Sequence, residues 1–123
     1  MIIEPIKPQP TFGYSNILKT EWLNGNLKTV KKGFYGDILT KKTVSLEHLK
    51  PASQGGKTST KNLVLASKRM NQARGCEDLK KFANKKNIIE YLMQFIGVKT
   101  KQFNGDEYIS NIIETLKTLD INL

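Results

Sequence analysis

Side chains that can activate water and hold a cation gather in one short stretch of the chain. His48, the only histidine among 123 residues, directly follows Glu47, and Asn62 and Asn71 come after it at spacings of fourteen and then nine positions. An imidazole titrates near neutral pH, so it can act as a general base. Carboxylate and amide oxygens are ligands that hard cations such as Mg²⁺ accept. These residue types suit phosphodiester hydrolysis, which needs a base for water and a cation to neutralise charge on the phosphate.

Local signals predict the elements that carry these residues. Residues 43–48 alternate apolar and polar positions, which predicts a short strand ending at the histidine. Residues 50–61 are rich in Gly, Ser, Thr and Lys and predict an exposed loop, followed by a second apolar strand over 62–66. Residues 67–74 predict a helix with a serine cap, which Gly75 can end. The predicted order is therefore strand, loop, strand, helix.

This stretch, residues 43–75, resembles the HNH (ββα-metal) nuclease motif, in the variant whose last ligand is asparagine. The resemblance rests on linked features: an acid-His pair, Pro51 three positions after the histidine, Gly-Gly in the loop, Asn-Leu opening the second strand, and Asn followed by Arg-Gly at the helix end. The His-Asn-Asn spacings are similar to those in the HNH domain of RNA-guided CRISPR nucleases. The resemblance covers about a quarter of the chain. It implies an α+β fold with a ββα-metal core.

The resemblance also implies a role for each residue. His48 would be the general base, while Glu47 and Asn71 would bind one divalent metal, Mg²⁺ or Mn²⁺. Asn62 would tie the loop to the strands and orient the base. Adjacent strand residues point to opposite faces, and in the family the bend at the strand end brings the acid and the histidine together. Each residue also has an ordinary interpretation, as a surface carboxylate, a surface histidine, a helix-surface amide or the start of a strand.

The cysteines that bind a structural zinc in many HNH proteins are missing. The resemblance would put the two knuckles at Lys32 and Tyr35 and at Ser67 and Met70. The single cysteine, Cys76, cannot supply a four-ligand site. We therefore expect no structural zinc, and we expect the flanking segments to stabilise the motif by packing.

Two aromatic segments precede the motif. Residues 33–37, Gly-Phe-Tyr-Gly-Asp, predict a tight turn whose rings pack under the strands and whose Asp37 bonds the turn backbone rather than a metal. A short helix is predicted from Ser15 to Leu23. Its Trp22 is expected in the core, with stacking on a nucleobase as the alternative.

Positive charge is concentrated around the motif. The formal net charge is +9, and fifteen of the twenty basic residues, but only four of the eleven acidic ones, lie between residues 28 and 86. This asymmetry favours contacts with the phosphates of a nucleic acid. DNA is the expected partner, with RNA left open, and the candidate phosphate contacts are Arg74, Lys50, Lys57 and Lys68.

The rest of the chain predicts a single domain over residues 11–123, preceded by an extended proline-containing arm at 1–10. Residues 77–120 predict a helical brace in three pieces, over 77–83, 87–96 and 104–119. An apolar face of these helices can alternatively form a homodimer or protein-partner interface. The sequence has no signal peptide and no window of transmembrane length, so we expect a cytoplasmic protein without a membrane partner.

The predicted function is that of a metal-dependent HNH endonuclease that hydrolyses DNA phosphodiester bonds. By family habit one site cuts one strand, so a monomer would nick DNA and a dimer could cut both strands. Small proteins of this type are frequent in phage and mobile elements. The alternatives are a non-catalytic nucleic-acid-binding module of the same fold and a nuclease subunit that depends on a protein partner.

Overall fold

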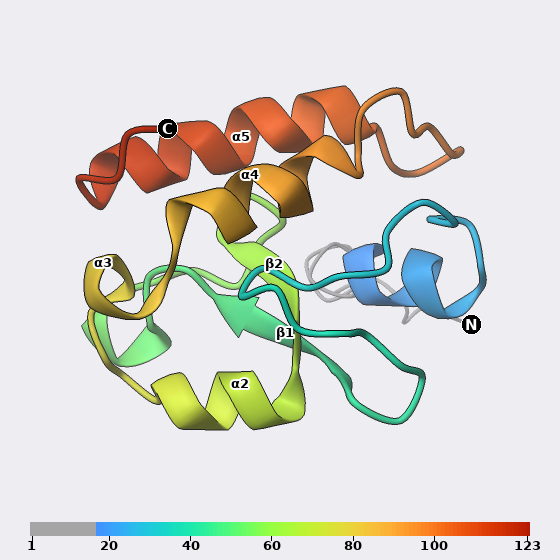
Figure 1. Ribbon diagram of the computed structural model, residues 1–123. Helices are drawn as coiled ribbons and strands as arrows, with labels where there is room; N and C mark the ends of the chain where they lie inside the picture. The colour runs from blue at the N-terminus through green and yellow to red at the C-terminus, as the bar shows by residue number, and fades with distance from the viewer. Residues whose placement is uncertain (1–16) are drawn as a thin grey trace, which may run out of the picture.

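A two-stranded antiparallel hairpin followed by a helix forms the centre of the computed structural model, which describes residues 17–123 (Figure 1). β1 (Val44–His48) pairs with β2 (Leu63–Ser67) along the whole length of both strands. α2 (Lys68–Arg74) begins directly after β2. The predicted strand, loop, strand and helix are confirmed, each within a residue of its predicted bounds. The fold is α+β, as expected.

Capping explains where α2 begins and ends. The Ser67 side chain accepts a hydrogen bond from the Met70 backbone N–H, which satisfies a donor left free in the first turn. Gly75 ends the helix with φ of 56°, and its N–H donates to the Asn71 carbonyl. Both caps agree with the sequence prediction. The loop between the strands contains a single turn of 3₁₀ helix, η2 (Ala52–Gln54).

Three further helices follow, and two of them cover the hairpin. They are α3 (Leu79–Phe82), α4 (Lys85–Met93) and α5 (Gly105–Thr118). Figure 1 shows α4 and α5 on one side of the hairpin and α2 on the other. The cap of α4 is Asn84, whose side chain accepts from the Asn87 N–H. This corrects the prediction that Asn87 begins this helix.

Tyrosine hydroxyls from α4 and α5 complete the outer edge of β2. The Leu65 N–H donates to the Tyr91 hydroxyl at 2.9 Å, and the Tyr108 hydroxyl donates to the Leu63 carbonyl at 2.7 Å. The Phe34 N–H adds a bond to the Leu65 carbonyl at 2.9 Å. Burial raises the pKa of both tyrosines, which keeps the hydroxyls protonated. Backbone groups at an exposed strand edge would otherwise pair with another chain or stay unsatisfied.

Asp37 joins the turn before the hairpin to the beginning of α2. Its Oδ2 accepts the backbone N–H of Ser67, thirty residues further on. Its backbone carbonyl accepts the Gly33 N–H at 2.7 Å, which closes the turn. The turn is as predicted, but the Asp37 carboxylate bonds the helix start instead of its own turn. The two segments where zinc knuckles would fall are therefore tied by hydrogen bonds.

α4 holds the same turn from the other side. Gln94 accepts the N–H groups of Lys31 and Lys32 at 2.8 and 2.9 Å, and its amide donates to the Lys32 carbonyl at 2.9 Å. Asn87 donates to the Tyr35 carbonyl at 3.1 Å. The C-terminal helices thus contact both the turn and β2, as expected of a brace.

The remaining described segments add a helix and an apolar groove. Residues 17–23 are helical, as predicted, whereas Ser15 and the arm at 1–10 lie outside the described residues. Between α4 and α5 runs a cavity of about 320 Å³ with exposed apolar side chains, including Ile89, Met93 and Ile96. In residues 17–123, no helix has the length and hydropathy to cross a membrane.

Candidate functional site

Glu47 lies in the interior at the end of β1, with only 4% of its surface exposed. The Tyr35 hydroxyl donates to Oε2 at 2.6 Å, and Arg74 Nη1 lies 3.5 Å from the same oxygen. Among residues 17–123, no side chain donates to the other oxygen, Oε1. Burial raises the pKa of this carboxyl above its ordinary value, and the bonds from Tyr35 and Arg74 offset part of that rise. In the described residues, Oε2 of Glu47 is therefore bound by Tyr35 and Arg74, whereas Oε1 has no side-chain donor.

Arg74 is a buried residue whose guanidinium binds backbone carbonyls. It is 3% exposed, and its guanidinium donates to the carbonyls of His48 at 2.6 Å, Leu49 at 2.9 Å and Glu77 at 2.9 Å. This burial conflicts with the prediction that Arg74 contacts a substrate phosphate, because the guanidinium lies in the interior and four of its five N–H groups have protein partners. It joins the end of α2 to the end of β1.

The position of Asn71 on α2 turns its amide toward β1. Nδ2 donates to the Leu46 carbonyl at 2.9 Å and contacts Ser45 Oγ at 3.3 Å. These bonds fix the orientation of the amide and leave Oδ1 for another partner. Ser45 and Glu47 are two positions apart on one strand, so their side chains share a face. Asn71 therefore contacts the side of β1 that also carries the Glu47 side chain.

The imidazole of His48 faces the loop. Nε2 lies 3.0 Å from Thr58 Oγ1, and the side chain is half-buried. Within the described part of the chain, no hydrogen bond or ion pair joins the ring to Glu47 or Asn71. Asn71 thus contacts the face of β1 that carries Glu47, whereas His48 lies at the end of the same strand with its ring held by Thr58.

Asn62 ties both sides of the loop together. Its side chain accepts the Lys50 N–H at 2.9 Å and donates to the carbonyls of Lys50 at 3.0 Å and Lys57 at 2.9 Å. Its own carbonyl accepts the Leu49 N–H at 2.9 Å. Since Thr58 follows Lys57 directly, this clamp also positions the residue that contacts His48. Asn62 thus makes the loop contacts that the resemblance implies.

The two loop glycines are needed for different reasons. Gly55 has φ of 89°, a conformation that side chains disfavour. Gly56 has no such φ, but a Cβ there would lie 1.7 Å from the Lys50 carbonyl oxygen. Of the pair, only Gly55 therefore adopts positive φ, whereas Gly56 allows the loop to close on the end of β1.

The predicted lysine contacts divide into two groups. Lys50 and Lys57 are exposed on the loop that Asn62 clamps, close in sequence to His48 and Thr58. Lys68 is exposed at the start of α2, where its N–H donates to the Thr43 carbonyl at 2.7 Å. It lies at the other end of the hairpin, about 13 Å from the histidine by the rise of four strand residues. Lys50 and Lys57 are the better placed for a phosphate beside His48.

Sequence reasoning missed three contacts of this site, from Tyr35, Thr58 and Ser45. Tyr35 was expected only to pack, and nothing in its spacing shows that its hydroxyl reaches Glu47. Thr58 belongs to a run of Gly, Ser, Thr and Lys in which no member differs from its neighbours by pattern. Ser45 alternates with apolar residues, which signals a strand but not a contact to α2.

The donor chemistry fits a hard divalent cation. Glu47 Oε1 and Asn71 Oδ1 are oxygens on one side of β1, and Mg²⁺ accepts few protein ligands because it keeps several waters. No group of three or more His, Cys, Asp or Glu that could hold a metal occurs in residues 17–123. A cation here would therefore depend on one carboxylate and one amide.

The raised pKa of Glu47 predicts how stability varies with pH. The folded protein binds this proton more tightly than the unfolded chain, for which the ordinary pKa is 4.5. Stability from this group is therefore fully present below that value and falls as pH rises through the folded pKa. Glu47→Gln does not titrate, so we expect its free energy of unfolding to fall less than that of wild type between about pH 4 and pH 7. Each unit of pKa difference contributes about 1.4 kcal/mol.

Urea unfolding at several pH values measures this difference. Glu77→Gln is the matched control, because Glu77 is exposed and its variant should follow wild type. If wild type instead gained stability over Glu47→Gln as pH rose, the pairing with Arg74 would outweigh burial, and folding would lower the pKa of Glu47 rather than raise it.

Comparisons with protein-family models, with curated proteins and with solved structures find no match to this chain. The features that bear on function are therefore the acid-His pair at the end of β1 and Asn71 on α2.

Proposed function

We propose that this protein is a small, metal-dependent endonuclease of the HNH type that hydrolyses phosphodiester bonds in DNA. One observation carries the proposal. Asn71 on α2 donates to the Leu46 carbonyl, and among residues 17–123 its amide oxygen accepts no hydrogen bond, on the side of β1 that carries Glu47 and near the strand end that bears His48. Those are the two oxygens and the base that this chemistry requires.

In the proposed reaction His48 takes a proton from the attacking water. If Nε2–H donates to the Thr58 hydroxyl, the ring keeps its lone pair on Nδ1, which is then the atom that accepts the proton. Arg74 holds the His48 carbonyl and Asn62 holds the loop that carries Thr58, so both position the base without touching substrate. Glu47 Oε1 and Asn71 Oδ1 would hold one Mg²⁺ or Mn²⁺. When bound, the metal ion supplies positive charge for the phosphate.

Charge supports a polyanionic substrate. The net charge is +9, and Lys50 and Lys57 are exposed on the loop beside His48. Binding through phosphates is insensitive to sequence and weakens steeply with salt. Specificity would then come from DNA shape or from a few loop contacts. A monomer would nick one strand, and a dimer formed through the apolar groove of α4 and α5 could cut both.

The second candidate is a nucleic-acid-binding module without turnover. The burial of Glu47 favours it, because one carboxylate oxygen already accepts from Tyr35 and pairs with Arg74. A glutamate in such a network can serve stability alone. The two candidates share the basic surface and differ in whether the bound DNA is cut.

A supercoiled-plasmid assay tests the proposal. We expect nicked circles with Mg²⁺ or Mn²⁺ and none with a chelator. Asn71→Ala should raise the metal concentration needed for half-maximal nicking roughly tenfold or more, while Gln72→Ala, an exposed neighbour on α2, should behave as wild type. Wild-type protein that shifts the plasmid on a gel but never cuts it in either metal would favour the binding module.

A further inference from the structure

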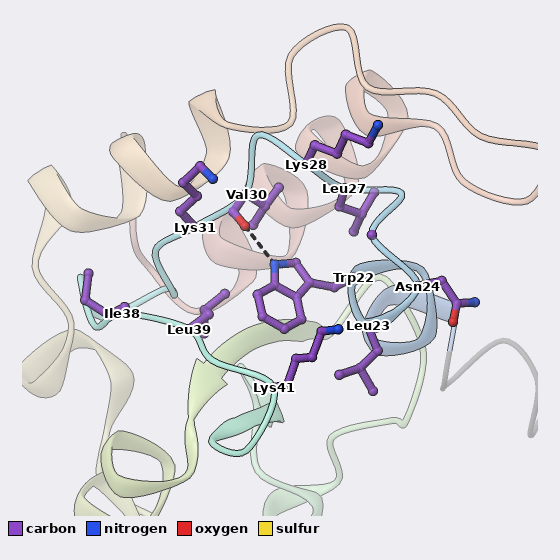
Figure 2. Close-up of a pocket in the computed structure, with 11 residues that line it drawn as sticks. Trp22, Leu23, Asn24, Leu27, Lys28, Val30, Lys31, Ile38, Leu39 and Lys41 are labelled. Carbon is purple, nitrogen blue, oxygen red and sulfur yellow. Dashed lines mark hydrogen bonds between the residues drawn. The ribbon is translucent and has the colours of Figure 1, made fainter.

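A second concave surface lies away from the candidate site. The cavity measures about 520 Å³, and its lining residues are Trp22, Leu23, Asn24, Gly25, Leu27, Lys28, Val30, Lys31, Ile38, Leu39 and Lys41 (Figure 2). Lys41 precedes β1, whereas His48 ends it, so the length of the strand separates the pocket from the histidine. The residues of the proposed catalytic site do not line it.

Trp22 gives this pocket an aromatic surface in a fixed orientation. Its indole N–H donates to the Val30 carbonyl at 2.7 Å, and the side chain is half-buried against the core. Figure 2 shows the indole in the middle of the lining residues, with the N–H directed at Val30. A ring that is already immobilised loses little freedom on binding and can stack on a flat partner.

Apolar side chains border the ring. Ile38 is 63% exposed and Leu23 is 36% exposed, and both line the pocket. They are two of the six large hydrophobic residues that are exposed in the described part of the chain, and the other four lie at or near the groove of α4 and α5. Exposed apolar groups gathered in a hollow favour a ligand with a flat apolar face.

The polar part of the lining favours an anion. Lys28, Lys31 and Lys41 are exposed around the cavity, and the described lining contains no acidic residue. A flat apolar centre surrounded by ammonium groups matches a base attached to phosphates. In contrast, a peptide ligand with basic groups would be repelled. Proteins that bind single strands combine stacking aromatics with a basic groove in this way.

We propose that the Trp22 pocket binds one unpaired base of a single-stranded nucleic acid, with the flanking phosphates on Lys28, Lys31 and Lys41. The ligand is a single strand because bases in a duplex are stacked on each other and cannot reach the indole. This site does not depend on catalysis at His48. If both proposals hold, the pocket would retain an unpaired segment about one strand length from the cut.

Trp22 reports directly on the proposal because it is the only tryptophan in the protein. Titration with an eight-residue thymidine oligonucleotide, in chelator to prevent cleavage, should quench its fluorescence. An abasic eight-mer with the same phosphates should bind without quenching, roughly 5- to 100-fold more weakly. Anisotropy of labelled strands measures both affinities. Equal quenching by the two strands, equal affinities, or no binding of either would overturn the proposal.

A pair of single-charge variants gives a second test that does not disturb the indole. Lys41→Ala removes a lysine that lines the pocket, while Lys42→Ala removes its exposed neighbour outside it. We expect Lys41→Ala to weaken binding of the thymidine strand several-fold more than Lys42→Ala does. Equal losses of affinity would mean that both lysines act only through the overall positive charge, which would overturn the assignment. Thymidine monophosphate that bound as tightly as the strand would overturn the choice of a strand as ligand.

Discussion

Replacing His48 with alanine is expected to lower the rate of plasmid nicking by roughly 10²- to 10⁴-fold, the usual contribution of a general base. The rate would fall because the variant has no imidazole to take a proton from the attacking water at neutral pH. Binding of DNA should change little, because lysines make the proposed phosphate contacts. The measurement is the rate of conversion of supercoiled plasmid to nicked circles at fixed metal concentration.

Thr58→Val distinguishes the effect of orienting the imidazole from the effect of the base itself. It removes the hydroxyl 3.0 Å from Nε2 but keeps the imidazole, so its rate should fall by less than that of His48→Ala. The free energy of unfolding in urea of both variants should match that of wild type within the range of surface substitutions, about 0.5 kcal/mol. Nicking that persists unchanged in His48→Ala would mean that another group is the base or that a contaminant cuts the plasmid.

The hairpin and its helix could be predicted from sequence because each boundary has a local cause. Alternation marks β1, Gly-Gly and Pro mark the loop, Ser67 can cap α2 and Gly75 can end it. These signals depend on a few neighbouring residues each, and they all favour the same structure. The cap of α4 was misplaced because Asn84 and Asn87 both suit a cap. Packing decides between them, since Asn87 is needed at the Tyr35 carbonyl.

The interior of the candidate site was less accessible to sequence reasoning. Arg74 follows Asn71 by three positions, so the two share a face of α2. A helix that turns Asn71 toward β1 therefore turns Arg74 inward as well, and the sequence contained that information. In contrast, no sequence pattern identifies the side chains that contact Glu47. The Tyr35 hydroxyl reaches the carboxylate from a turn twelve residues earlier, and only the packing of that turn brings it there.

The C-terminal brace has a chemical form that a hydrophobic pattern does not reveal. Apolar spacing predicted helices that cover the hairpin, and α4 and α5 do so. Tyr91 and Tyr108 occupy apolar positions in that pattern, yet their hydroxyls satisfy the edge of β2. Gln94 follows the last helical residue of α4 and holds the turn at Lys32. Hydrogen bonds between distant segments thus connect the turn, the hairpin and the C-terminal helices.

Arg74→Ala is expected to lower the free energy of unfolding by about 3–5 kcal/mol, the usual cost of removing one partner of a buried ion pair. The variant loses the bonds to the carbonyls of His48, Leu49 and Glu77 and leaves Glu47 buried without its cation. The total free energy of unfolding of a native domain is about 5–15 kcal/mol. Urea unfolding measures the loss, and Arg69→Ala, an exposed arginine on the same helix, should stay within about 0.5 kcal/mol of wild type.

The same two variants distinguish a structural arginine from a phosphate contact. If Arg74 bound substrate, Arg74→Ala would unfold like wild type and lose DNA affinity, which is the opposite of the expected result. Adding Glu47→Gln then isolates the ion pair, because the double variant no longer buries an unpaired charge. We expect it to be destabilised by less than the sum of the single variants, by about 0.5–3 kcal/mol. Strict additivity would mean that Arg74 acts through the carbonyls alone, and that the charge on Glu47 is held by Tyr35.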